Sequence, residues 1–119
     1  REGLIENSAA MGAYLRDRLR KQLADNPFVG DVRGAGLMVA VEFVVDKKRR
    51  RFFDPKTQSH RIVARQALEE GVQLRALPYG EINSFSPPLC ITRNEIDEVV
   101  ARFTRALDRA MPELRQLAA

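Results

Sequence analysis

The chain has 119 residues, of which 45% are hydrophobic and 30% are charged, and its formal net charge is +4. This length predicts one domain with an ordinary core, and the composition excludes a disordered chain. No apolar run approaches the roughly 20 residues that cross a bilayer, so we expect no membrane partner. The lone cysteine excludes an internal disulfide and favours a cytoplasmic protein, and one histidine with one cysteine cannot complete a zinc site.

The first predicted element is an amphipathic helix over residues 3–25. Apolar residues recur along it at the three- and four-residue multiples of one helix face, at Leu4, Met11, Leu15, Leu19 and Leu23. Asn26-Pro27 ends this helix, because proline cannot continue the hydrogen-bond ladder. The chain starts at Arg1 without an initiator methionine and inside the helix pattern, so we expect it to be a fragment of a longer protein.

A strand is predicted over residues 37–45, after a loop or short strand over residues 29–36 with a tight bend at its glycines. One face of the strand is fully apolar and should meet a layer of helices; it carries Leu37, Val39, Val41 and Phe43. The opposite face is mixed and carries Met38, Ala40, Glu42 and Val44. Alternation of this kind is typical of a sheet that is covered on one side.

The basic run Lys47–Arg51 follows this strand. We interpret it as a solvated connection, and a grip on nucleic-acid phosphates is the alternative. Asp54 is then predicted to cap a second helix, with Pro55 as its first residue. We expect this helix to be fully formed by about Gln58. Gly71 should end that helix in the left-handed conformation.

Two further strands are predicted over residues 72–77 and 82–89, the second ending at Pro87-Pro88 because proline lacks the N–H donor. Thr92 and Glu95 match a capping box at the start of the last helix. Its core stripe comprises Ile96, Val99, Val100, Phe103, Leu107 and Met111. The order of elements predicts an α+β fold: a small, mainly antiparallel sheet of three to four strands with helices packed on one face.

The residues offer no self-contained active site. Gly34-Ala35-Gly36 lacks the third glycine of a dinucleotide fingerprint and leads into a strand rather than a helix. Cys90 has only His60 as a possible imidazole partner, and a buried inert thiol is favoured over a catalytic pair. Arg75 lies inside an apolar strand, where its planar fork could bind a carboxylate with two parallel bonds. A position on the wet face, or a structural acidic partner, remains the alternative for Arg75.

Four segments in the same order resemble the C-terminal domain of class III, pyridoxal-phosphate-dependent aminotransferases. They are Val29–Met38 (VGDVRGAGLM), Gly71–Arg75 (GVQLR), Ser86–Thr92 (SPPLCIT) and Glu95–Asp97 (EID). The match covers nearly the whole chain, and four motifs in register are more specific than any one of them. The resemblance implies that residues 1–119 are the small domain of such an enzyme, without its large cofactor-binding domain.

The activity that the resemblance implies is transfer of an amino group between an amine or amino acid and a keto acid such as pyruvate. Pyridoxal phosphate acts as the electron sink, bound to a lysine of the large domain. The lysines of this chain lack the desolvated setting that imine formation requires; they are Lys21, Lys47, Lys48 and Lys56. We therefore expect no catalytic residue, no bound cofactor and no activity in this chain alone.

Arg75 matches the position of a mobile, carboxylate-binding arginine in the ω-amino-acid:pyruvate branch of the family. The resemblance thus implies that Arg75 binds the substrate and that this domain helps to close the active site. The connection over residues 77–81 departs from that branch in being slightly longer, which would shift Arg75. Arg33 is expected to have a structural role, tying the small domain to its surroundings through backbone or carboxylate contacts.

The family works as homodimers, so the expected partners are the large domain and a second subunit, with no nucleic acid. The apolar stripe of the first helix is a candidate for the surface that they cover. Two alternatives remain. One is a basic α+β module that binds nucleic acid through Lys47–Arg51, and the other is a stand-alone dimerisation domain.

Overall fold

The computed structural model describes residues 2–35, 38–49, 51–53, 58–72, 75–76, 82–85 and 91–118, with only the backbone for residues 2–5, 35, 52 and 75–76. The elements in chain order are α1 (Glu2–Leu23), β1 (Val29–Ala35), β2 (Met38–Asp46), β3 (Arg51–Phe52), α2 (Ser59–Glu69), β4 (Arg75–Ala76), β5 (Ile82–Phe85) and α3 (Arg93–Ala118). In this described part of the chain, none of the helices has the length and apolar character to cross a membrane.

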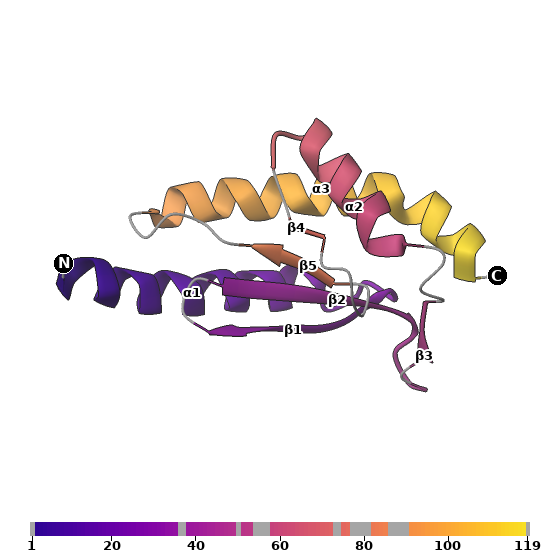
Figure 1. Ribbon diagram of the computed structural model, residues 1–119, viewed down its shortest axis with the longest axis horizontal. Helices are drawn as coiled ribbons and strands as arrows, with labels where there is room; N and C mark the ends of the chain where they lie inside the picture. The colour runs from indigo at the N-terminus through magenta and orange to yellow at the C-terminus, as the bar shows by residue number, and fades with distance from the viewer. Residues whose placement is uncertain are drawn as a thin grey trace.

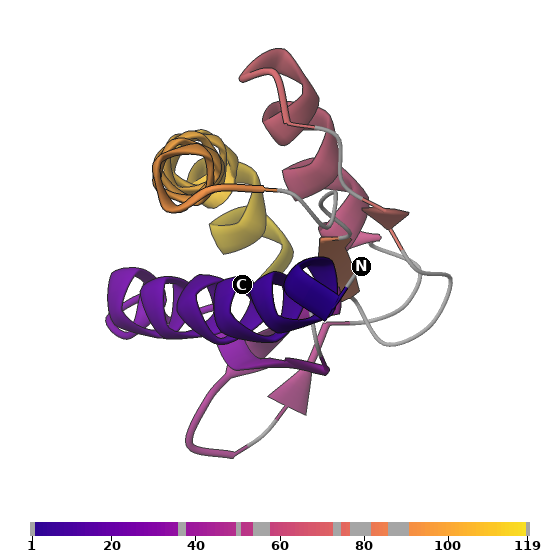
Figure 2. The ribbon, with the colours of Figure 1, turned by 90° about the vertical axis from the view of Figure 1, so that its left-hand side faces the viewer.

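The sheet is antiparallel throughout and has the strand order β1-β2-β5-β4, with the two-residue β3 paired to the far end of β2. The helices form a second layer against this sheet (Figures 1 and 2). The predicted α+β class and the helices on one face are confirmed. The strand β3 was not predicted, because Arg51 is the last residue of the basic run and two residues are too few to show an alternating pattern.

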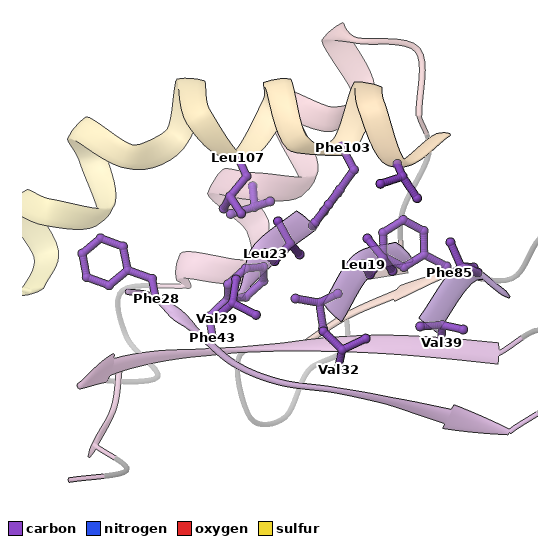
Figure 3. Close-up of a cluster of buried hydrophobic side chains, with 14 of the residues drawn as sticks. Leu19, Leu23, Phe28, Val29, Val32, Val39, Phe43, Phe85, Phe103 and Leu107 are labelled. Carbon is purple, nitrogen blue, oxygen red and sulfur yellow. The ribbon is translucent and has the colours of Figure 1, made fainter. Parts of the chain in front are cut away.

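A large hydrophobic core fills the space between the sheet and the helices (Figure 3). The apolar face predicted for β2 is confirmed, since Val39, Val41 and Phe43 are fully buried and Met38 on the opposite face is 61% exposed. Leu37 lies outside the described residues. From the helix side, Phe103 of α3 packs edge-on against Phe85 of β5, with ring centroids 5.0 Å apart.

The apolar stripe of α1 lies inside this core. Met11, Leu15, Leu19 and Leu23 are all buried within the chain, and α1 contacts β1, β2 and α3. The expectation that this stripe is covered by another domain or subunit is therefore wrong for these four residues. The periodic pattern identified an apolar face, but it carried no information on which element packs against it.

The first residues of two helices test two predictions. The Thr92–Glu95 capping box is confirmed: the Thr92 N–H donates to Glu95 Oε1 at 3.1 Å, and the Glu95 N–H donates to Thr92 Oγ1 at 3.3 Å. For α2, the cap is Gln58 in a left-handed conformation and the helix begins at Ser59, so the prediction of Asp54 as its cap is wrong. Asp54-Pro55 itself lies outside the described residues.

Candidate functional site

The sheet register locates the backbone of Arg75, the one residue predicted to bind substrate. Arg75 pairs with Ser84 of β5, Ser84 pairs with Ala40 of β2, and Ala40 pairs with Arg33 of β1. Position 75 therefore belongs to the edge strand β4 and ends a row that crosses the whole sheet. The side chain of Arg75 is not among those described, so its contact with a carboxylate stays a prediction.

The chain enters β4 from a well-formed helix end. Gly71 has a φ of +86°, which confirms its predicted left-handed conformation. Its N–H donates to the Leu68 carbonyl at 3.0 Å, and the Val72 N–H donates to the Ala67 carbonyl at 2.8 Å. These two bonds form a Schellman motif, and Val72 is buried against Ala67 and Ala106. The direction of the chain is thus set three residues before Arg75.

Glu70, at the same helix end, is held by arginines of α3. Its carboxylate accepts a hydrogen bond from Arg105 Nε at 3.0 Å and forms an ion pair with Arg109 Nη1 at 2.9 Å. Its backbone carbonyl accepts Arg102 Nη1 at 3.2 Å, and Arg102 Nε also binds Glu98 at 2.8 Å. The Glu70 side chain is only 12% exposed. We refer to Glu70 and its three arginines as the Glu70 clamp.

The Glu70 clamp was missed by sequence reasoning. Arg102, Arg105 and Arg109 recur at spacings of three and four, which places three cations along one side of a helix. An acidic residue directly before Gly71, the predicted helix end, is the second signal. Neither signal shows that the two segments meet, because 35 residues separate Glu70 from Arg105.

The clamp has a predicted pH dependence. The hydrogen bond from Arg105 and the charges of Arg109, Arg105 and Arg102 hold the pKa of Glu70 below its ordinary value of 4.5, against the opposing effect of desolvation. A carboxylate with a lowered pKa in the folded state stabilises the fold fully above its ordinary pKa, and this contribution is lost as the pH falls.

Glu70→Gln should therefore lower the free energy of unfolding near neutral pH, and its difference from the parent chain should shrink below about pH 4.5. Urea unfolding of both chains between pH 3 and 7 measures this difference. A difference that stays constant across this range would contradict the prediction.

Arg33 makes carboxylate contacts within this chain, and the tie to the surroundings of the domain that was expected of it stays a prediction. Arg33 Nη1 lies 3.4 Å from both Asp31 Oδ2 and Glu42 Oε2. The Glu42 side chain is 19% exposed, so its place on the sheet is explained by this ion pair as well as by solvent. Arg33 thus joins β1 to β2 on the mixed face of the sheet.

The described lysines do not fit a pyridoxal phosphate site. Lys21 is 72% exposed and pairs with Asp17, Lys47 Nζ donates to the Ala24 carbonyl at 3.0 Å, and Lys48 is exposed. A lysine that forms an imine requires a desolvated amine. Lys56 lies outside the described residues. Among the residues that the structure describes, no three His, Cys, Asp or Glu side chains group as metal ligands.

Two other sequence predictions concern the basic run and the cysteine. Lys47, Lys48 and Arg49 form an exposed turn between β2 and β3, where Asp46 accepts the N–H groups of Lys48 and Arg49. This agrees with a solvated connection. His60 is buried, and Cys90 lies outside the described residues, so the inert, buried thiol stays a prediction.

The family model of class III aminotransferases matches residues 1–107. The chain belongs to this family. A class III relative, the diaminobutyrate–2-oxoglutarate transaminase of Halomonas elongata, is 48% identical over 114 residues, which are 96% of this chain and 24% of the relative. The chain thus spans about a quarter of the length of this class III aminotransferase.

Solved structures of transaminases have the same fold. A transaminase from directed evolution by ancestral reconstruction superimposes with a TM-score of 0.89 at 47% identity, covering 95% of this chain and 25% of that chain. The ω-transaminase of Pseudomonas jessenii superimposes with a TM-score of 0.84 at 37% identity, covering 95% of this chain and 24% of that one. The α+β arrangement of this chain is therefore also found within longer transaminases.

Proposed function

We propose that residues 1–119 are the small C-terminal domain of a pyridoxal-phosphate-dependent transaminase that moves an amino group between an amine or amino acid and a keto acid. The family membership and the quarter-length match to longer transaminases support this assignment. When bound, pyridoxal phosphate would supply the electron sink for the reaction. The imine-forming lysine would belong to the large domain, because the described lysines of this chain are exposed.

The partners of this domain would be its own large domain and a second subunit in a homodimer. Within that assembly its role would be to recognise the substrate carboxylate and to help close the active site. The single observation that carries this role is the position of Arg75 on the edge strand β4, paired to the buried Ser84. An edge strand leaves one side of the backbone free of the sheet, which suits a residue that meets substrate there.

Arginine is suited to the carboxylate because its guanidinium presents two parallel N–H donors to the two carboxylate oxygens. Every 2-keto acid offers such a group beside the reacting carbonyl. The Halomonas relative is named for 2-oxoglutarate, whereas the ω-amino-acid:pyruvate branch implies pyruvate. Both keto acids therefore belong in the test of the proposed function.

In the complete enzyme, Arg75→Ala should raise the KM for the accepted keto acid about 10- to 100-fold, since a hydrogen-bonded charge contributes about 1.5–3 kcal/mol. The KM for an amine without a carboxylate, such as n-butylamine, should change less than about threefold. Steady-state kinetics with pyruvate or 2-oxoglutarate as acceptor measures the first value, and the amine half-reaction measures the second.

Arg75→Lys is the matched control for this test. It keeps the positive charge but loses the planar fork, so its KM for the keto acid should lie between those of the parent enzyme and Arg75→Ala. Equal effects of Arg75→Ala on the keto acid and on n-butylamine would show that Arg75 does not bind the carboxylate.

A further inference from the structure

The Glu70 clamp lies at the end of α2 from which the chain enters β4. Glu70 precedes Arg75 by five positions, and the Schellman motif at Gly71 and the buried Val72 occupy the positions that follow it directly. On the far side, the Arg75 backbone is paired to Ser84. The described residues thus give position 75 two nearby anchors, the helix end at the clamp, which is described as far as Val72, and the pairing of its own backbone with β5, while residues 73 and 74 lie outside the described part.

We propose that Glu70 and Arg102 are positioning residues for Arg75, an inference that rests on the proposed function. The α3 helix is 26 residues long and its inner face is buried in the core, so it provides a rigid reference. Through the clamp, the last turn of α2 takes its position from this helix. A shift of about 1 Å in a substrate-binding group can cost about 100-fold in rate, so the origin of the Arg75 side chain matters for binding.

Within the clamp, Arg102 contacts the backbone of Glu70, whereas Arg105 and Arg109 contact its carboxylate. Its Nη1 donates to the Glu70 carbonyl, and a Cβ atom added at Gly71 would lie 2.6 Å from the same nitrogen. The guanidinium thus lies directly over the glycine that turns the chain. Glycine is favoured at position 71 by its left-handed conformation, and a side chain there would also displace the Arg102 guanidinium.

A second ion pair between α2 and α3 provides a control that distinguishes positioning of Arg75 from stabilisation of the helix contact. Arg65 of α2 lies 3.7 Å from Glu113 of α3, and both side chains are at least half exposed. This pair also ties α2 to α3, but it does not contact the turn that leads to β4. Glu113→Gln therefore changes the same chemistry at the same helix interface, away from Arg75, and is the matched control for Glu70→Gln.

The test uses the complete enzyme with whichever of pyruvate and 2-oxoglutarate it accepts. Glu70→Gln should raise the KM for the keto acid about fivefold with kcat changed less than about twofold, because the defect is in binding geometry. Glu113→Gln should leave both constants within about twofold of the parent enzyme. Thermal unfolding of each variant shows that the comparison is made between folded enzymes.

A double-mutant cycle with Arg75→Ala decides whether Glu70 acts through Arg75. In the Arg75→Ala background, Glu70→Gln should have no further effect on the KM, since the group that it positions is gone. A persisting effect, an unchanged KM in Glu70→Gln alone, or an equal rise in Glu113→Gln would overturn the inference while the proposed function stands. If Arg75→Ala itself leaves the KM unchanged, the proposed function fails and this inference fails with it.

Discussion

Phe103→Ala should lower the free energy of unfolding of this chain by about 3–5 kcal/mol, the range for removal of a buried aromatic ring. Phe103 is fully buried at the middle of α3, where its ring packs against Phe85 of β5 (Figure 3). Truncation removes this edge-on ring contact and leaves a cavity between the helix layer and the sheet. The surrounding side chains come from different elements, so they cannot all move inward to fill it.

Urea unfolding followed by circular dichroism measures this loss. Phe103→Leu keeps most of the apolar volume and should cost about 1–2 kcal/mol, which separates the cavity from the loss of the ring. Arg115→Ala, on the exposed side of the same helix, should stay within about 0.5 kcal/mol of the parent chain. If Phe103→Ala cost less than about 1 kcal/mol, this ring would not be central to the core.

Gly34→Ala should destabilise the chain by about 3 kcal/mol, at the upper end of the usual cost of overpacking. A Cβ atom at Gly34 would overlap the Met38 carbonyl oxygen and would lie 2.9 Å from Val39 Cα. Both are backbone atoms of the paired strand β2, so the two strands themselves would have to separate. The glycine of the Arg33-Gly34 motif is thus explained by the close approach of β1 and β2.

Gly30→Ala is the matched control in the same strand. There the added Cβ would lie 2.5 Å from Val44 Cγ1, which belongs to a side chain rather than to the backbone. Rotation of the valine can relieve part of this contact, so the loss should be about 1–2 kcal/mol. Equilibrium unfolding of the two variants side by side measures the difference. Equal losses would show that the backbone overlap at Gly34 is relieved by a small local shift.

Much of the fold could be predicted from local patterns. The alternation over Val39–Phe43 and the helical spacing from Met11 to Leu23 identified faces that are buried in the structure. Thr92 with Glu95, and Gly71, marked helix ends that the structure confirms. Each of these signals depends on residues within a few positions of one another, so the local sequence is sufficient to predict them.

The predictions that were wrong depended instead on contacts between distant parts of the chain. Asp54 carries the chemistry of a helix cap, but α2 begins at Ser59, and local propensity cannot say which of several possible starts tertiary packing selects. The stripe of α1 was assigned to an external surface, whereas it packs within the same chain. For the α1 stripe, the residues were correctly identified as apolar and their partner was not.

The order of apolar and turn-forming residues was sufficient to establish the α+β class, the approximate limits of α1, β1 and β2, the start of α3 and the resemblance to class III aminotransferases. Each of these depends on residues that lie close together in the sequence. Folding was needed to join Glu70 to Arg105 and Arg109, to place Arg75 beside Ser84, and to turn the α1 stripe inward. Contacts between distant positions depend on how whole elements pack to bury their apolar faces together, and that balance is a property of the assembled chain.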